Sequence, residues 1–189
     1  MNKTAEEPRD IAALLVGGRA GVGKSTVSWE ISAQLEDARI AHAHVEGDFL
    51  DRVFPAPEGD PNRSAVTEAN LAAIWANFAA AGCRRLIYTN TVSVLEPDLI
   101  DRALGGAVRL TRVLLTAEDG TARDRLAGRE IGGELDAHLR RSASAARYLE
   151  EHAPTEVVRI RTDRRPVVEI AREIIAATGW AAGPADGWS

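Results

Sequence analysis

The chain has 189 residues, of which 45% are hydrophobic and 27% charged, values typical of a soluble globular protein with one sizeable core. Its 28 acidic and 23 basic residues give a formal net charge of −5, which argues against a nucleic-acid partner. No apolar run reaches the length of a membrane span, and the single cysteine excludes an internal disulfide, so we expect a cytoplasmic protein without a membrane partner. We expect one domain over residues 1–180 and a flexible tail over 181–189.

The first expected elements are a buried strand at 11–16 and a helix over 24–37, whose apolar residues recur at four-residue spacing. Between them, residues 18–25 match the phosphate-binding pattern G-x-x-x-x-G-K-[ST] at every position. Glycines in such a loop let successive backbone N–H groups point at phosphate oxygens, and the helix N-terminus adds its positive end. A nucleoside triphosphate is therefore the expected ligand, with Lys24 on the β- and γ-phosphates and Ser25 on Mg²⁺.

The alternative for this stretch is a glycine-rich turn with a chance Lys-Ser pair. Lys24 is one of only two lysines among 23 basic residues. In a chain with so few lysines, a lysine at the position that the motif requires argues against a chance match. The residues expected to hold the nucleotide here are Gly18, Arg19, Ala20, Gly21, Val22, Gly23, Lys24, Ser25 and Thr26.

The second strand, expected over 40–45, leads into the acidic residues Asp48 and Asp51. Ligands of open parallel sheets gather beyond the carboxyl ends of the strands. Asp48 is therefore the leading candidate for the base that takes a proton from an attacking hydroxyl, or for a ligand of a Mg²⁺-bound water. The alternative is ordinary Gly-Asp turn chemistry. We expect Asp51 and Arg52 to bind the acceptor, with a solvated surface pair as the alternative.

The middle of the chain contributes one further candidate, Asn90, which follows the third expected strand and is placed to hydrogen-bond the acceptor. In chain order, we expect a turn-rich connection at 55–61, a helix over 64–81 capped by Ser64 with Thr67 and Glu68, strand 85–88, a helix over 97–104 and strand 108–116.

Two arginine-rich helices are expected next, over 118–129 and 134–152, joined by the glycine-containing segment 131–133. Their functional interpretation is a lid that closes over the triphosphate, with Arg125 and Arg129 spreading the charge of the transferring phosphoryl group. The alternative is a solvated helix face in a chain that uses arginine nearly everywhere another protein uses lysine.

The last expected elements are a strand over 157–160 and a helix over 166–178. Thr162 and Asp163 lie between them, and we expect both beside the nucleotide base. The alternative is a plain strand-to-helix cap. Alternating strands and helices of this kind predict an α/β fold with a mostly parallel sheet.

Four stretches of the chain resemble small P-loop kinases, the group of adenylylsulfate kinase, gluconate kinase, chloramphenicol phosphotransferase and the nucleoside monophosphate kinases. They are residues 18–25, Glu46-Gly47-Asp48, Arg125-Leu126-Ala127-Gly128-Arg129 and Ile160-Arg161-Thr162-Asp163, and the resemblance covers nearly the whole length. It implies a three-layer P-loop NTPase fold with a five-stranded parallel sheet in the order 2-3-1-4-5, helices on both faces and a short helical lid. It also implies that Asp48 serves as base or metal-water ligand and that Arg125 and Arg129 bracket the nucleotide.

Two departures from these patterns narrow the function. Many P-loop enzymes carry an acid at the end of the third strand, where this chain has Thr89 and Asn90, so an ATP-hydrolysing motor is disfavoured. The Asp-Gly-x-Pro-Arg stretch of many nucleoside monophosphate kinases is also missing, which disfavours a nucleotide acceptor. We therefore expect ATP and Mg²⁺ as cofactors, a hydroxyl of a metabolite or antibiotic as acceptor, and a monomer or homodimer.

Two alternatives stay open at this point. One is a nucleotide-dependent switch, although the guanine motif Asn-Lys-x-Asp does not occur within the predicted fold. The other is an ATPase that acts without a small-molecule acceptor.

Overall fold

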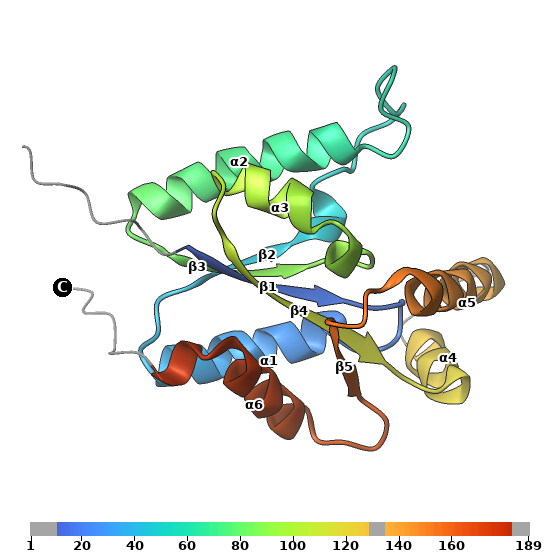
Figure 1. Ribbon diagram of the computed structural model, residues 1–189. Coiled ribbons are helices and arrows are strands. Elements are labelled where there is room, and N and C mark those ends of the chain that lie inside the picture. The colour runs from blue at the N-terminus through green and yellow to red at the C-terminus, as the bar shows by residue number, and fades with distance from the viewer. Residues whose placement is uncertain (1–10, 129–134, 183–189) are drawn as a thin grey trace, which may run out of the picture.

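The computed structural model describes residues 11–128 and 135–182. Five parallel strands form one sheet in the order β2-β3-β1-β4-β5, which confirms the predicted order (Figure 1). The strands are β1 Ala12–Gly17, β2 Ala43–Glu46, β3 Arg85–Thr89, β4 Arg109–Thr116 and β5 Val158–Arg161. The largest departure from the predicted bounds is at β2, which begins at Ala43 and not at Ile40.

Helices cover both faces of this sheet, as expected for the fold class (Figure 1). They are α1 Lys24–Asp37, α2 Ser64–Ala80, α3 Pro97–Ala103, α4 Asp119–Ala127, α5 Leu135–His152 and α6 Val167–Thr178. Short 3-10 turns, which the sequence did not predict, occur at η1 Gly47–Phe49, η2 Ser93–Leu95 and η3 Trp180–Ala182. Residues 183–189 of the predicted tail lie outside the described residues.

The central strand β1 is buried on both faces, which explains its uninterrupted apolar sequence. Leu14 and Val16 face α1 and α6, and their neighbours Ala13 and Leu15 face α2 and α3. Successive side chains of a strand point to opposite faces, so one apolar run supplies both cores. β1 therefore fixes the loop that follows it at the middle of the sheet edge.

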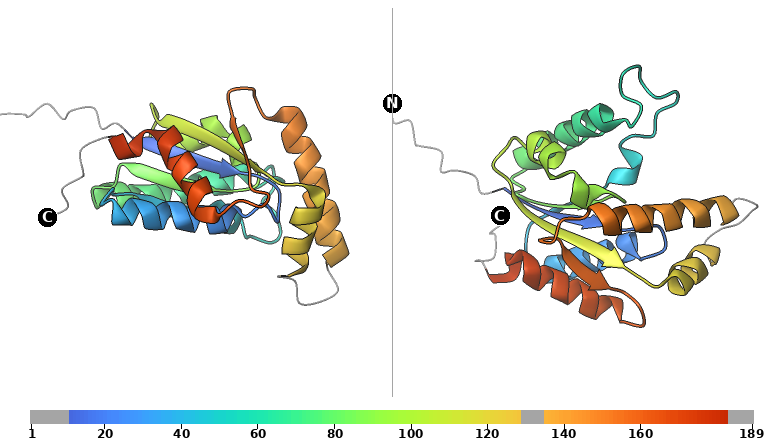
Figure 2. Two further views of the ribbon diagram at one scale, coloured as in Figure 1. Left: turned by 90° about the horizontal axis from the view of Figure 1, so that it is seen from below. Right: turned by 45° about the vertical axis from the view of Figure 1, so that its right-hand side comes forward.

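The arginine-rich helices α4 and α5 pack against each other beyond the carboxyl ends of β4 and β5 (Figure 2). Leu149 of α5 packs on Leu114 of β4 and on Val157, which attaches the C-terminal part of α5 to the sheet. The remainder of this helix pair lies above the sheet edge, in the position of the predicted lid. None of the helices in the two described ranges is long and apolar enough to cross a membrane.

The start of α2 differs from the expected cap. The side chain of Asp60 accepts hydrogen bonds from the backbone N–H groups of Ala65 and Val66, at 3.0 and 3.2 Å. Thr67 instead donates its hydroxyl to the carbonyl of Arg63 at 3.0 Å. The cap therefore comes from the turn before the helix, because Arg63 takes a left-handed conformation, with φ of 58°, that brings Asp60 back over the first turn.

Candidate functional site

The glycine loop between β1 and α1 is tightly curled. Gly18, Gly21 and Gly23 have φ values of 142°, 88° and 96°, which residues with a Cβ rarely adopt. A Cβ at Gly18 would lie 2.7 Å from the carbonyl oxygen of Leu115, and a Cβ at Gly21 would lie 2.5 Å from that of Ala122. The loop therefore needs glycine for its conformation and for its close approach to β4 and α4.

The ammonium group of Lys24 lies across this loop. Its Nζ donates to the carbonyl oxygens of Gly18, at 2.9 Å, and of Arg19, at 3.5 Å. α1 begins at Lys24, and the backbone N–H groups at the start of a helix have no carbonyl partner within that helix. Loop amides, a helix N-terminus and one cation thus converge where a phosphate chain would bind.

Arg19 ties this loop to the lid. The residue is only 6% exposed, and its Nε donates to Oγ of Ser142 in α5 at 2.9 Å. The same guanidinium forms an ion pair with Asp119 of α4 and lowers the pKa of that carboxyl. Ser142 in turn donates to the carbonyl of Ala20 at 2.9 Å. The side chain of Arg19 is thus occupied by the lid helices, which leaves its backbone for the predicted contact with phosphate.

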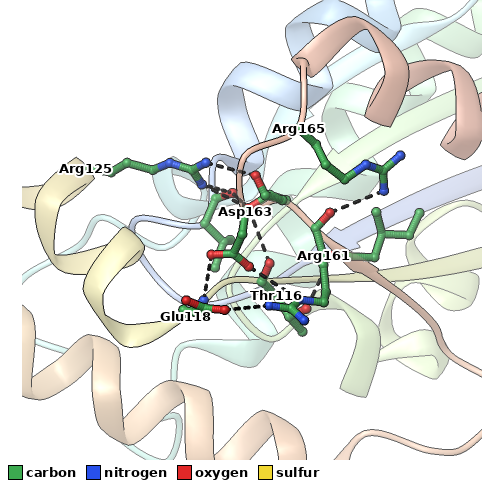
Figure 3. Close-up of polar contacts among 9 residues, drawn as sticks. Thr116, Glu118, Arg125, Arg161, Asp163 and Arg165 are labelled. Carbon is green, nitrogen blue, oxygen red and sulfur yellow. Dashed lines mark hydrogen bonds and ion pairs between the residues drawn. The ribbon is translucent and has the colours of Figure 1, made fainter.

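Arg125 connects α4 to the segment after β5 (Figure 3). Its Nη1 donates to Oγ1 of Thr162 at 2.9 Å and to the carbonyl of Val22 at 3.3 Å, and its Nη2 donates to the carbonyl of Thr162 at 3.0 Å. Thr162 is 2% exposed and donates its own hydroxyl to Val22 at 3.0 Å. These bonds place a predicted lid arginine directly against the phosphate loop.

A cavity of about 220 Å³ opens beside Arg125. Its walls are mostly apolar, and they come from the phosphate loop, α1, α4 and the start of α6, which makes it the candidate site for the nucleotide base. The lining residues are Val22, Gly23, Thr26, Val27, Arg125, Thr162, Arg165, Val167 and Ile170.

Asp163 faces the start of α4, where it accepts a hydrogen bond from the N–H of Glu118 at 2.9 Å (Figure 3). Burial raises the pKa of Asp163, but this bond, the hydroxyl of Thr121 and the nearby Arg161 outweigh burial, so the net pKa lies below its ordinary value of 3.8. The capping alternative therefore describes its position. A contact of Asp163 with the base stays a prediction, as does one of Thr162.

The acceptor candidates lie on the opposite flank of the sheet, after β2. Asp48 is exposed in η1, and its carboxylate has no hydrogen bond or ion pair within the described ranges. Gly47 packs against Tyr88, because a Cβ on Gly47 would lie 2.5 Å from Cζ of that buried ring. Asp51 is half-buried. The pKa of Glu96 is raised, first by the burial of Glu96 itself and then by the negative charge of Asp51. Acidic groups thus gather beside Asp48.

Beyond these acids, a cavity of about 470 Å³ is lined by Asp51, Arg52, Val53, Phe54 and Arg63. The structure therefore brings the predicted acceptor residues Asp51 and Arg52 together on one cavity wall. Asn90 lies apart from this lining: its Oδ1 accepts the N–H of Val92 at 3.0 Å, which shapes the turn before η2. Its contact with an acceptor stays a prediction.

Glu46 is a candidate that the sequence analysis did not select. It lies opposite Thr89 in the parallel register of β2 and β3, and Oγ1 of Thr89 donates to its Oε2 at 2.6 Å. Its Oε1 is buried and has no hydrogen-bond partner among the described residues. His44 Nε2 is 3.8 Å from that oxygen, but burial lowers the pKa of His44, so the ring is neutral at pH 7. Glu46 therefore supplies a carboxylate at the end of β3, where the sequence has none.

Three oxygen-bearing side chains are of the kind that would hold a Mg²⁺ ion or its waters. This cation keeps several waters and takes one or two carboxylates together with substrate phosphates. The hydroxyl of Ser25, the unpartnered Oε1 of Glu46 and the carboxylate of Asp48 are such donors. Within residues 11–128 and 135–182, no group of three or more histidine, cysteine or acidic side chains forms a metal centre of its own. Arg129 and the predicted hinge 131–133 lie outside the described residues.

No protein-family model matches the chain, and no curated protein does. Solved structures do match. A gluconokinase from Sinorhizobium meliloti is 20% identical and aligns over 91% of this chain and 94% of that chain, with a TM-score of 0.57. The tunicamycin resistance protein of Deinococcus radiodurans is 19% identical over 89% and 96%, with a TM-score of 0.58. The APS kinase of Mycobacterium tuberculosis is 20% identical over 90% and 98%, with a TM-score of 0.56. The chain has the fold of the small P-loop kinases.

Proposed function

We propose that this chain is an ATP-dependent phosphotransferase that moves the γ-phosphoryl group to a hydroxyl of a small molecule. The observation that carries the proposal is the position of the glycine loop. It follows the central strand β1. The cavity lined by Arg125 lies beyond β5 on one flank, and the cavity lined by Asp51 and Arg52 lies beyond β2 on the other. A donor and an acceptor bound in these two cavities would meet at the loop. The gluconokinase and the APS kinase, which was solved with AMPPNP and APS, support the same reaction class.

Residues of the phosphate loop, the lid and the segment after β2 each have a task in the proposed transfer. Asp48 accepts the proton of the acceptor hydroxyl, whose oxygen forms a bond to the γ-phosphorus while the bond from that phosphorus to the bridging oxygen breaks and ADP leaves. Lys24 and Arg125 stabilise the negative charge on the phosphate oxygens. Mg²⁺, when bound with the triphosphate, neutralises part of the same charge, and Ser25, Glu46 and Asp48 are the residues that would hold it or its waters.

The test is an ATP-consumption screen with hydroxyl-bearing metabolites and with aminoglycoside, phenicol and nucleoside antibiotics. We expect ADP release that depends on one class of acceptor. Asp48→Asn should then lower turnover by about 10²-fold or more while ATP affinity is retained, because the variant cannot take the proton. Asp37→Asn is the matched control, since Asp37 is an exposed aspartate at the end of α1. Unchanged turnover in Asp48→Asn would remove Asp48 from the role.

The position of Glu46 makes an acceptor-free ATPase the second candidate. The sequence argument against hydrolysis was the missing acid after the third strand, and the bond between Glu46 and Thr89 places an acid there. Steady ADP release without any acceptor, abolished in Glu46→Gln and kept in Asp48→Asn, would favour this second function over phosphoryl transfer.

A further inference from the structure

The acceptor flank exposes an unusual concentration of apolar side chains. Among the described residues, seven large hydrophobic side chains are exposed, and three of them lie within residues 49–54. Phe49 is 71% exposed, Val53 40% and Phe54 94%. Val53 and Phe54 line the 470 Å³ cavity next to Asp48, whose size falls in the range of small-molecule sites. These two apolar side chains, among three charged ones on the lining, favour an acceptor with an apolar surface of its own.

Two guanidinium groups on the same cavity are fixed in place but hold no anion. Arg52 donates its Nε to the carbonyl of Asp48 at 3.3 Å, and Arg63 donates its Nε to the carbonyl of Val53 at 3.1 Å. Within the described ranges, neither side chain pairs with a carboxylate. Their terminal nitrogen atoms therefore remain as donors in the planar geometry that suits a carboxylate.

The charges on the cavity wall set the charge of the ligand. Asp51 contributes one negative charge, and Arg52 and Arg63 contribute two positive charges, so the lining carries a net charge of +1. A single carboxylate balances the charge of this lining, to which Asp48 does not belong. A cationic acceptor such as an aminoglycoside would face two guanidinium groups, and a polyhydroxy acid without a ring would leave Val53 and Phe54 uncovered.

We propose that the acceptor is a ring-bearing hydroxy carboxylate. Its hydroxyl lies at the Asp48 end of the site, its aromatic or alicyclic ring packs on Val53 and Phe54, and its carboxylate binds Arg52 and Arg63. This inference rests on the proposed phosphotransferase function for the position of the hydroxyl, whereas the ring and carboxylate contacts are a matter of binding alone.

The test is a binding titration with four matched probes, first without nucleotide and then with ATP and Mg²⁺. The probe 3-phenyllactate carries hydroxyl, ring and carboxylate. Its methyl ester removes the charge, lactate removes the ring, and gluconate replaces the ring by hydroxyls. We expect 3-phenyllactate to bind at least about tenfold more tightly than each of the others. A charge-assisted hydrogen bond contributes about a factor of ten in affinity, and so does a buried phenyl ring.

Variants separate the two contacts. Phe54→Ser should weaken 3-phenyllactate binding about tenfold and make the protein nearly indifferent to the ring, so that lactate and 3-phenyllactate bind alike. Arg63→Gln, and independently Arg52→Gln, should abolish the preference for the acid over its ester. Val168→Ser and Arg172→Gln are the controls, because both side chains are exposed on α6, away from this cavity. ATP affinity should be unchanged in all five variants.

The outcomes distinguish this inference from the proposed function. Equal binding of lactate and 3-phenyllactate, equal binding of acid and ester, or no binding of any probe overturns the inference. Phosphorylation of gluconate with no response to the ring probes also overturns it while the phosphotransferase function stands. If ATP neither binds nor is consumed, the proposed function fails, and the nucleotide-free titration still decides whether a ring-bearing carboxylate binds here.

Discussion

The two flanks of the candidate site are built in different ways. On the nucleotide flank, buried polar contacts join distant parts of the chain: Arg19 contacts Ser142, and Arg125 contacts Thr162. On the acceptor flank, the side-chain hydrogen bonds of Arg52 and Arg63 join residues that are close together along the chain. Phe49 and Phe54 on this flank are exposed to solvent. The first flank is part of the folded core, whereas the second is a surface segment attached to it.

This difference matches the chemistry expected of each flank. A triphosphate presents the same groups to every enzyme that uses it, so a rigid loop that the core holds in place suits it. An acceptor varies from one enzyme to another, and a segment with few buried contacts can change its residues at little cost in stability. Variants on the nucleotide flank should therefore change ATP affinity, whereas variants on the acceptor flank should change turnover or acceptor binding and leave ATP affinity unchanged.

The largest effect is expected for Lys24→Ala. Loss of the ammonium group from the loop should lower turnover by about 10²–10³-fold and weaken ATP binding, because the other cation of the loop, Arg19, is held by Ser142 and Asp119 of the lid helices. Steady-state kinetics and calorimetric titration with ATP and Mg²⁺ measure both quantities. Lys3→Ala, at the only other lysine, is the control. Retained ATP affinity in Lys24→Ala would contradict the role given to the loop.

Gly47→Ala tests the acceptor flank. A Cβ there meets the buried ring of Tyr88, so η1 must shift and carry Asp48 with it. We expect turnover to fall by about 10²-fold with ATP affinity unchanged, because small displacements of a reacting group have large kinetic effects. Gly120→Ala is the control, since a Cβ at Gly120 would meet nothing within 4 Å. A parallel loss of ATP affinity would show that the two flanks are coupled.

Arg125→Ala should weaken ATP binding about tenfold and destabilise the fold by about 2 kcal/mol, since three hydrogen bonds to Thr162 and Val22 are lost. Arg123→Ala on the same helix is the matched control, because Arg123 is exposed. Calorimetry with ATP and thermal unfolding give the two values. Equal effects of the two variants would mean that Arg125 acts only as part of a solvated helix face.

The smallest effect concerns pH. The pKa of Asp163 is lower in the folded chain than its ordinary value of 3.8, so this group adds stability above that value, and the contribution is lost as pH falls below 3.8 through the folded pKa. Asp163→Asn should therefore lower stability by about 1 kcal/mol at pH 7 and reduce the loss of stability on acidification. Denaturant titrations at pH 7 and pH 3 test this, and an unchanged difference between them would contradict it.

Much of the fold followed from local patterns. The apolar run of β1, the four-residue spacing in α1 and the glycine loop between them predicted those elements within one residue of their observed bounds. The capping residue of α2 was predicted wrongly, because Asp60 reaches its partners only through the left-handed turn at Arg63. Backbone conformations of that kind leave a weak signal in sequence when the residue is not glycine.

The sequence by itself determined the phosphate loop, the alternation of strands and helices and the acidic residues after β2, because each depends on spacing among neighbours along the chain. Only the tertiary structure decided that Arg125 contacts Thr162, 37 residues away, and that Glu46 contacts Thr89, 43 residues away. Contacts of this kind depend on which strands lie side by side. Sheet order is set by the packing of helices on both faces, and no local pattern carries it.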